Sequence, residues 1–166
     1  LAETTDLYVM QEVWDPALFN SIRLTSGYPS GFYGGDKDGL NPLNSGLFTM
    51  SRLPLSGGTQ VFYNDENGTI EGLASKGYTR VRLTKDGFPI TIYNTHTQSG
   101  DTDDDKATRA LQLNQLAIDV VVFRTLFPND IVLVTGDFNV WGEGSEFYGS
   151  MQTALGANGA QLADGA

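Results

Sequence analysis

Short apolar runs rich in β-branched and aromatic residues recur along this chain, separated by turn-forming residues. Runs of this length and composition are typical of strands. The predicted strands cover residues 6–13, 46–51, 60–64, 78–84, 88–95 and 131–135. One long helical pattern, residues 106–127, lies before the last of them, with Leu113, Leu116 and Val120 on one face. A chain that intermixes strands and helices in this way belongs to the α/β or α+β class.

Turn and capping residues place the remaining elements. The pair Asp15-Pro16 resembles an N-cap followed by a first helical position, so it predicts a short helix that begins there. Residues 27–45 are rich in Gly, Pro, Asn and Asp, which predicts a loop. The Asp-Gly pair at residues 86–87 predicts a hairpin turn. A short final helix is predicted over residues 145–155.

In two of the predicted strands, the order of apolar and polar residues indicates which faces are buried. Over residues 78–84, apolar residues alternate with arginines, which is typical of a half-exposed strand. The run IVLVT at residues 131–135 is almost wholly apolar, which is typical of a strand covered on both faces. The length of 166 residues predicts a single domain over residues 1–166.

Composition excludes several classes of function. Ten Lys and Arg stand against 20 Asp and Glu, which gives a net charge of −10. This balance disfavours nucleic acid as a partner, although a bound divalent cation would change the local field. The absence of cysteine excludes disulfides, zinc–thiolate sites and thiol catalysis. No apolar run reaches the roughly 18 residues that a membrane span requires, so no transmembrane segment is predicted.

Four polar residues stand where predicted apolar strands end: Glu12, His96, Asp137 and Asn139. Side chains at such positions are held firmly and still reach solvent. Glu12 is a hard oxygen ligand suited to Mg²⁺ or Mn²⁺. Asp137 and Asn139 are two apart, so on an extended chain they point to the same side. His96 is the only histidine. A lone histidine is more often a core residue, but the polar residues that follow His96 make a functional role about as probable as a structural one.

Five segments resemble, in the same order, motifs of the endonuclease/exonuclease/phosphatase superfamily, which has the DNase I-like fold. The segments are YVMQEV at residues 8–13, GLFTMSRLPL at 46–55, NTHTQ at 94–98, RALQL at 109–113 and GDFN at 136–139. Within the superfamily, Ser75-Lys76-Gly77-Tyr78 before a strand that leads to NTHTQ resembles the neutral sphingomyelinase branch.

The resemblance implies a DNase I-like β-sandwich of two mixed sheets flanked by helices, and a Mg²⁺-dependent hydrolase of phosphodiester bonds, similar to sphingomyelin phosphodiesterase. It implies that Glu12 binds Mg²⁺, with Mn²⁺ as an alternative, and that Asp137 and Asn139 orient the water and the phosphate. It implies that His96 contacts the scissile phosphate. We therefore expect these four side chains to converge around one divalent cation.

The resemblance also implies the setting of the site. The expected substrate is a phosphodiester, with a phospholipid head group favoured over nucleic acid, and the protein is expected to make peripheral contact with a membrane. Sphingomyelinase-like proteins are commonly secreted or membrane-associated. The alternatives are a nuclease or a phosphoinositide phosphatase of the same superfamily, or a degenerate homologue that only binds.

Two family elements have no counterpart in these residues. The family carries an Asn-bearing strand before the Gln-Glu strand and a Ser-Asp-His segment near its end. We therefore expect the domain to be incomplete at both termini, and the 166 residues alone to be nearly inactive although the parent protein is an enzyme.

Three further features have structural explanations beside functional ones. Residues 101–105 hold four carboxylates, which suit a helix N-terminus better than a metal site. Arg109 is expected to form an ion pair, either at the surface or anchoring the helix in its first turns, and Lys76 is expected either to be exposed or to pack near the site. Asn67 begins a glycosylation sequon of the kind that arises often by chance.

Overall fold

Seven strands and two helices make up the part of the chain that the computed structural model describes, residues 5–35, 43–64, 74–140 and 152. In chain order they are β1 Leu7–Met10, α1 Pro16–Thr25, β2 Ser30–Tyr33, β3 Phe48–Ser51, β4 Ser56–Phe62, β5 Gly77–Lys85, β6 Phe88–His96, α2 Asp103–Leu126 and β7 Ile131–Asp137. All six predicted strands and two of the three predicted helices are confirmed; the third helix, over residues 145–155, lies almost wholly outside the described residues, of which only residue 152 falls within it.

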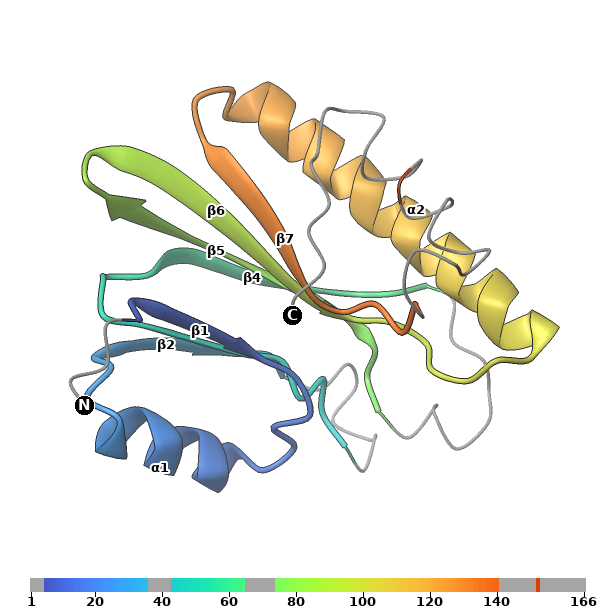
Figure 1. The fold of residues 1–166 in the computed structure, drawn as a ribbon, viewed down its shortest axis with the longest axis horizontal. Helices are drawn as coiled ribbons and strands as arrows, with labels where there is room; N and C mark the ends of the chain where they lie inside the picture. The colour runs from blue at the N-terminus through green and yellow to red at the C-terminus, as the bar shows by residue number, and fades with distance from the viewer. Residues whose placement is uncertain (1–4, 36–42, 65–73, 141–151, 153–166) are drawn as a thin grey trace.

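The elements form four layers, in the order helix, sheet, sheet, helix (Figure 1). The smaller sheet has the order β1-β3-β2, with both pairings antiparallel. The larger sheet has the order β4-β5-β6-β7; its first two pairings are antiparallel and β6–β7 is parallel. Helix α1 lies on the outer face of the smaller sheet, and α2 on that of the larger one. The predicted two-sheet sandwich flanked by helices is confirmed.

The local signals in the sequence act where they were expected. Asp15 caps α1 by accepting a hydrogen bond from the backbone N–H of Ala17 at 2.8 Å, and Pro16 occupies the first helical position. The β5–β6 hairpin turns at Asp86 and Gly87, whose φ angles of 53° and 83° lie in the left-handed region. An Asp-Gly pair tolerates that conformation, which explains the strength of the turn signal.

The loop predicted over residues 27–45 contains a strand that the sequence analysis missed. Strand β2 pairs with β3 over four residues, from Ser30 opposite Ser51 to Tyr33 opposite Phe48. Phe32 and Tyr33 favour a strand, but the Pro-Ser-Gly sequence before them favours a turn, so the local β signal is mixed. Pairing with the buried strand β3 therefore decides its conformation.

The exposed face predicted for residues 78–84 is corrected by the structure. In β5, Val81 and Leu83 pack between the two sheets, as alternation implies. The opposite face lies under α2, where Arg80 pairs with Asp119 at 2.7 Å and the Arg80 and Arg82 guanidinium groups stack over aromatic rings at the C-terminal end of the helix. The arginines are thus bound to the helix rather than directed into open solvent.

The prediction that the apolar strand at residues 131–135 is covered on both faces is wrong for the described part of the chain. Strand β7 is the last strand of its sheet. Val132 and Val134 pack toward α2, but Ile131 and Leu133 on the other face are 47% and 43% exposed. An apolar sequence indicates burial in general and cannot reveal a position at a sheet edge.

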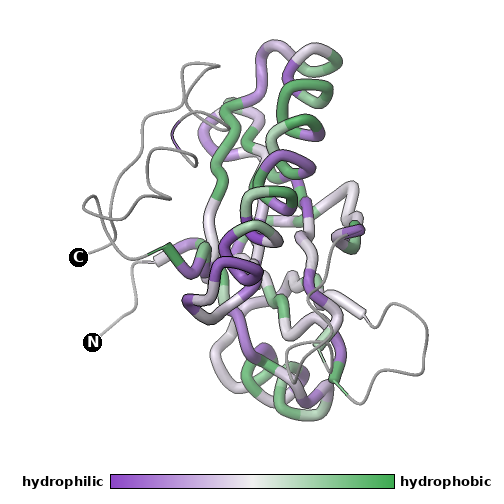
Figure 2. Tube along the Cα trace, turned by 90° about the vertical axis from the view of Figure 1, so that its right-hand side faces the viewer, coloured by the Kyte–Doolittle hydropathy of each residue, from purple (hydrophilic) through white to green (hydrophobic). Residues whose placement is uncertain are grey.

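Helix α2 packs on the larger sheet through the main hydrophobic cluster. Its buried members are Tyr63, Tyr78, Tyr93, Leu113, Leu116, Ala117, Val120 and Phe123. Figure 2 shows hydrophobic and hydrophilic residues alternating around this helix, as its amphipathic sequence requires. This packing fixes β6 and β7, whose C-terminal ends carry the candidate site.

Candidate active site

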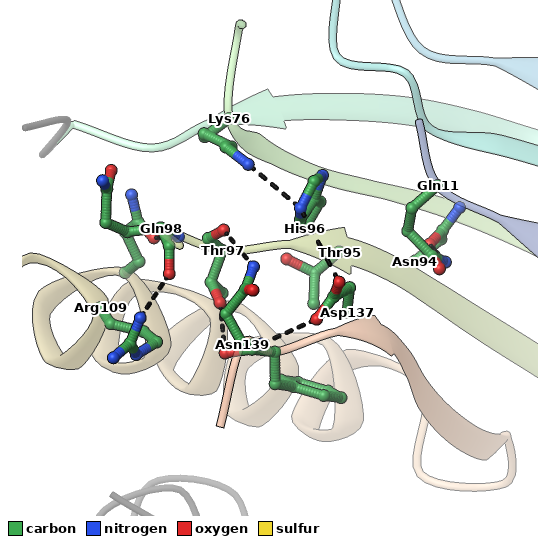
Figure 3. Close-up of polar contacts among 12 residues, drawn as sticks. Gln11, Lys76, Asn94, Thr95, His96, Thr97, Gln98, Arg109, Asp137 and Asn139 are labelled. Carbon is green, nitrogen blue, oxygen red and sulfur yellow. Dashed lines mark hydrogen bonds and ion pairs between the residues drawn. The ribbon is translucent and has the colours of Figure 1, made fainter. Parts of the chain in front are cut away.

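The parallel pairing of β6 and β7 brings His96 and Asp137 together. They are register partners at the ends of the two strands, and the His96 Nε2 lies 4.0 Å from a carboxylate oxygen of Asp137. The side chain of His96 is only 4% exposed, whereas that of Asp137 is 51% exposed. A buried imidazole therefore faces a carboxylate that solvent or a substrate can reach (Figure 3).

Gly136 makes this close pairing feasible. Its φ of 135° lies in a region that favours glycine, and a Cβ at this position would collide with the backbone of Thr95. The glycine before the Asp-Phe-Asn sequence thus allows the two strands to approach each other directly beside His96 and Asp137.

The chain turns after Asp137 instead of continuing in extended conformation. The backbone N–H of Asn139 donates to the Asp137 carboxylate at 2.9 Å, and the φ of Asn139 is 50°. The Asn139 side-chain amide donates to the carbonyl of Thr97 at 3.0 Å, while the Thr97 hydroxyl donates to the carbonyl of Phe138 at 2.6 Å. The prediction of an extended chain is therefore corrected: the two side chains are linked by a turn that is bound to the end of β6 (Figure 3).

Lys76 contacts the same ring nitrogen of His96 that faces Asp137. Its ammonium nitrogen lies 3.1 Å from His96 Nε2, and the residue is only 4% exposed. An ammonium group can only donate, so in that state the imidazole accepts at Nε2 and carries its proton on Nδ1. Of the two interpretations of Lys76, packing near the site is confirmed, and exposure is wrong.

Glu12 lies two residues after the end of β1, and contacts of its neighbours fix its place. Its φ is 60°, an uncommon conformation for a residue with a Cβ, and its side chain is exposed. On one side, the Gln11 amide donates to Asn94 of β6 at 2.7 Å; on the other, the Trp14 ring lies 6.3 Å from the His96 ring, centre to centre. Both contacts are with β6, so Glu12 lies at the same end of the sandwich as His96.

The Glu12 carboxylate is the group that the sequence analysis assigned to Mg²⁺. No group of three or more His, Cys, Asp or Glu side chains that could hold a metal exists among the residues that the structure describes, so Glu12, His96 and Asp137 do not gather as ligands of one ion. Mg²⁺ does not require such a cage, because it keeps several waters and binds through one or two carboxylates and a substrate phosphate. The exposed carboxylate of Glu12 suits that mode of binding.

The acidic segment at the start of α2 has a structural role. Thr102 and Asp105 form a capping box, and the Asp105 carboxylate also accepts from the Gln98 amide at 3.1 Å. Arg109 is almost fully buried and donates to the carbonyls of Gln98 and Gly100 at 2.6 and 3.1 Å. Of the two alternatives expected for Arg109, the surface position is wrong: Arg109 anchors the start of α2 from the interior, through backbone carbonyls. Burial lowers its pKa, and nearby carboxylates oppose that shift.

Curated proteins named sphingomyelinase C are similar to this chain in sequence. No family model matches the chain. Sphingomyelinase C 2 of Leptospira interrogans is 24% identical over 160 residues, which cover 86% of this chain and 26% of that protein. The sphingomyelinase C of Listeria ivanovii is 25% identical over 157 residues, 83% of this chain and 46% of that protein. The chain thus spans less than half the length of these curated relatives.

Solved structures share the fold. Sphingomyelinase C of Streptomyces griseocarneus matches 92% of this chain and 57% of its own length, with a TM-score of 0.79 and 26% identity. A beta toxin variant of Staphylococcus aureus covers 92% of this chain and 58% of its own, with a TM-score of 0.78 and 21% identity. A truncated TDP2 of Caenorhabditis elegans matches 83% of this chain and 51% of its own length, with a TM-score of 0.60 and 18% identity. The resemblance to the DNase I-like superfamily, and within it to sphingomyelinases, is confirmed.

The sequence analysis did not identify two residues that lie next to the candidate site. Asn94 lies inside a strand and is fully buried, and Trp14 packs on His96. The signal for Asn94 was available, since asparagine is uncommon in strand interiors. Nothing in the local sequence distinguishes Trp14 from an ordinary core aromatic.

Proposed function

We propose that the protein carrying this chain is a Mg²⁺-dependent phosphodiesterase that acts on a sphingomyelin-like phospholipid. The observation that carries the proposal is the pairing of buried His96 with exposed Asp137 at the ends of parallel strands, in a fold shared with sphingomyelinase C enzymes. Sequence similarity to sphingomyelinases over more than four-fifths of the chain supports the choice of substrate.

The reaction is attack of water on phosphorus, in line with the bond that breaks. As the bond from the water oxygen to phosphorus forms, the bond from phosphorus to the lipid oxygen breaks, so that a phosphorylated head group and the lipid alcohol leave. Asp137, the exposed carboxylate, accepts the proton of the attacking water. The lipid oxygen takes up a proton as it departs.

The surrounding side chains stabilise the charge that develops on the phosphate. Lys76 supplies a buried positive charge beside His96. His96 contacts the phosphate in the tautomer that carries its proton on Nε2, in which Nε2 donates to the phosphate instead of accepting from Lys76. The Asn139 amide, oriented by its bond to the Thr97 carbonyl, donates its second N–H toward the phosphate. Donors held in fixed positions need no reorganisation as charge develops, which is the main source of such stabilisation.

Glu12 is the residue proposed to hold Mg²⁺. A bound Mg²⁺ polarises a phosphoryl oxygen and stabilises the negative charge of the leaving oxygen. The beta toxin variant with the same fold was solved with bound magnesium ions. In the described residues, neither helix has an apolar stretch long enough to cross a bilayer, and the contact with a lipid surface is proposed to be peripheral.

The proposal is tested by the Asp137→Asn substitution in the intact protein. Release of the phosphorylated head group from sphingomyelin vesicles is measured with Mg²⁺ and after its removal by EDTA. We expect Asp137→Asn to lower kcat by at least about 10²-fold, because the general base is lost. Asp6→Asn, at an exposed carboxylate that pairs with Lys85, serves as a matched control and should keep the wild-type rate.

Three outcomes would contradict the proposal. Unchanged turnover in Asp137→Asn would remove Asp137 from the chemistry. Full activity in EDTA would remove the metal. Hydrolysis of DNA or of a phosphoinositide, with none of sphingomyelin, would assign the site to another branch of the superfamily.

A further inference from the structure

Asn94 is an asparagine at a buried position within a strand, where this residue type is uncommon. It lies within β6 and is fully buried, although asparagine is depleted from strands and a buried amide is costly unless its hydrogen-bonding groups are satisfied. Its neighbour Ile92, two residues before it on the same face, is an ordinary core residue between the sheets. An apolar side chain at position 94 would continue that core.

The Asn94 amide is satisfied by three hydrogen bonds that cross from one sheet to the other. Its nitrogen donates to the carbonyl of Met10 at 2.9 Å and to that of Phe48 at 3.2 Å, which uses both of its hydrogens. Its oxygen accepts from the Gln11 amide at 2.7 Å. Met10 and Phe48 face each other in the last pair of the β1–β3 ladder, so the amide holds the end of β1.

This attachment lies directly before Glu12. The bonds fix residues 10 and 11, after which the chain takes the left-handed conformation at Glu12. Asn94 and His96 are alternate residues of β6 and so point to the same face. Figure 3 shows Gln11 beside Asn94, with His96 further along the same strand. Strand β6 therefore binds the residue before Glu12 through Asn94 and presents the imidazole through His96.

We infer that Asn94 is a positioning residue for divalent-cation binding, acting through Glu12. The inference rests on the part of the proposed function that assigns the cation to Glu12. Removal of a group that orients a metal ligand through a hydrogen bond commonly lowers metal affinity by 10- to 100-fold. We therefore expect loss of the Asn94 amide to weaken cation binding by about tenfold or more, with the ligand itself intact.

Mn²⁺ is the probe, because its binding is measured by electron paramagnetic resonance without substrate. Asn94→Ala in the intact protein should raise the Kd for Mn²⁺ about tenfold. Gln11→Leu, which removes one of the three bonds and leaves the two to the carbonyls, should raise it by less. Thr91→Val is the matched control: Thr91 is a fully buried residue of β6 that donates to Asp130 at 2.6 Å, so its loss should destabilise the protein and leave the Kd unchanged.

A double-mutant cycle separates positioning from general destabilisation. Glu12→Gln alone should weaken Mn²⁺ binding strongly, and adding Asn94→Ala to it should have little further effect. A wild-type Kd in folded Asn94→Ala, or an equal loss in the presence and absence of the Glu12 carboxylate, would overturn the inference. If Asn94→Ala does not fold, an unchanged Kd in Gln11→Leu overturns it.

The two proposals fail separately. Absence of sphingomyelin hydrolysis together with the expected changes in Mn²⁺ affinity would reject the proposed function and support the role of Asn94. Hydrolysis with no effect of Asn94 on Mn²⁺ affinity would do the reverse.

Discussion

At the scale of single residues, two cationic side chains are buried, and each is bound to specific partners. Lys76 and Arg109 are both buried, and neither is an ordinary surface charge. Burying a charge is costly unless it is paired or hydrogen-bonded. Arg109 donates hydrogen bonds to backbone carbonyls of the β6–α2 connection, whereas the Lys76 ammonium contacts His96.

Lys76 therefore permits a direct test. Lys76→Met keeps most of the packing of the side chain but removes the charge and the contact with His96. We expect sphingomyelin turnover to fall by about 10²-fold, the usual effect of losing one preorganised donor. Initial rates over a range of substrate concentrations would check this, with circular dichroism to confirm folding.

Lys85→Met is the control for that experiment. Lys85 is a half-exposed lysine of the β5–β6 hairpin that pairs with Asp6, and its loss should leave the rate unchanged. A folded Lys76→Met protein with a rate within about twofold of wild type would show that Lys76 has a packing role only.

At the scale of elements, the long helix begins at a carefully satisfied N-terminus. The Thr102 hydroxyl accepts from the backbone N–H of Asp105, and the Asp105 carboxylate accepts from the backbone N–H of Thr102. Both bonds satisfy donors that would otherwise lack a partner at a helix end. This arrangement accounts for part of the acidic segment without a metal.

Thr102→Ala should therefore lower the free energy of unfolding by about 1 kcal/mol, the usual contribution of an N-cap side chain. Asp103→Ala, an exposed position in the same first turn, should change it by less than about 0.5 kcal/mol. Urea denaturation of both variants measures the difference. Unchanged stability in Thr102→Ala, together with a loss in Asp103→Ala, would show that charge at the helix end stabilises α2 and that the cap does not.

At the scale of the whole molecule, a buried carboxylate joins the larger sheet to the turn after α2. Asp130 accepts two hydrogen bonds from the Arg82 guanidinium, each at 2.9 Å, and one from the Thr91 hydroxyl at 2.6 Å. Burial alone would raise the pKa of Asp130, but the hydrogen bonds from Arg82 and Thr91 outweigh it, so its pKa lies below the ordinary value.

That shift predicts acid-sensitive stability. A carboxyl group whose pKa is lower in the folded state stabilises it above the unfolded pKa, near 3.9, and this contribution is lost as pH falls through the folded pKa. The difference in unfolding free energy between wild type and Asp130→Asn should thus be largest at neutral pH and shrink below about pH 4.

Chemical denaturation at pH 7, 5 and 3 tests this dependence. Val81→Ala, a core substitution without a titrating group, should cost the same at each pH. A gap between wild type and Asp130→Asn that stays constant or widens toward pH 3 would contradict the assignment.

What the sequence determined by itself was local. The cap at Asp15, the turn at residues 86–87, the amphipathic face of α2 and the polar residues at strand ends all depend on neighbours within a few positions. Glu12, His96, Asp137 and Asn139 could be named for that reason, and the motifs that carry the resemblance are equally short.

Tertiary structure decided everything that depends on which surfaces meet. Pairing with β3 made residues 30–33 a strand, the edge position of β7 left Ile131 and Leu133 exposed, and α2 covered the arginines of β5. The contact of Lys76 with His96 and the three bonds of Asn94 join residues 20 to 84 positions apart. Such contacts depend on how the sheets and the helix pack, and no short window of sequence carries that information.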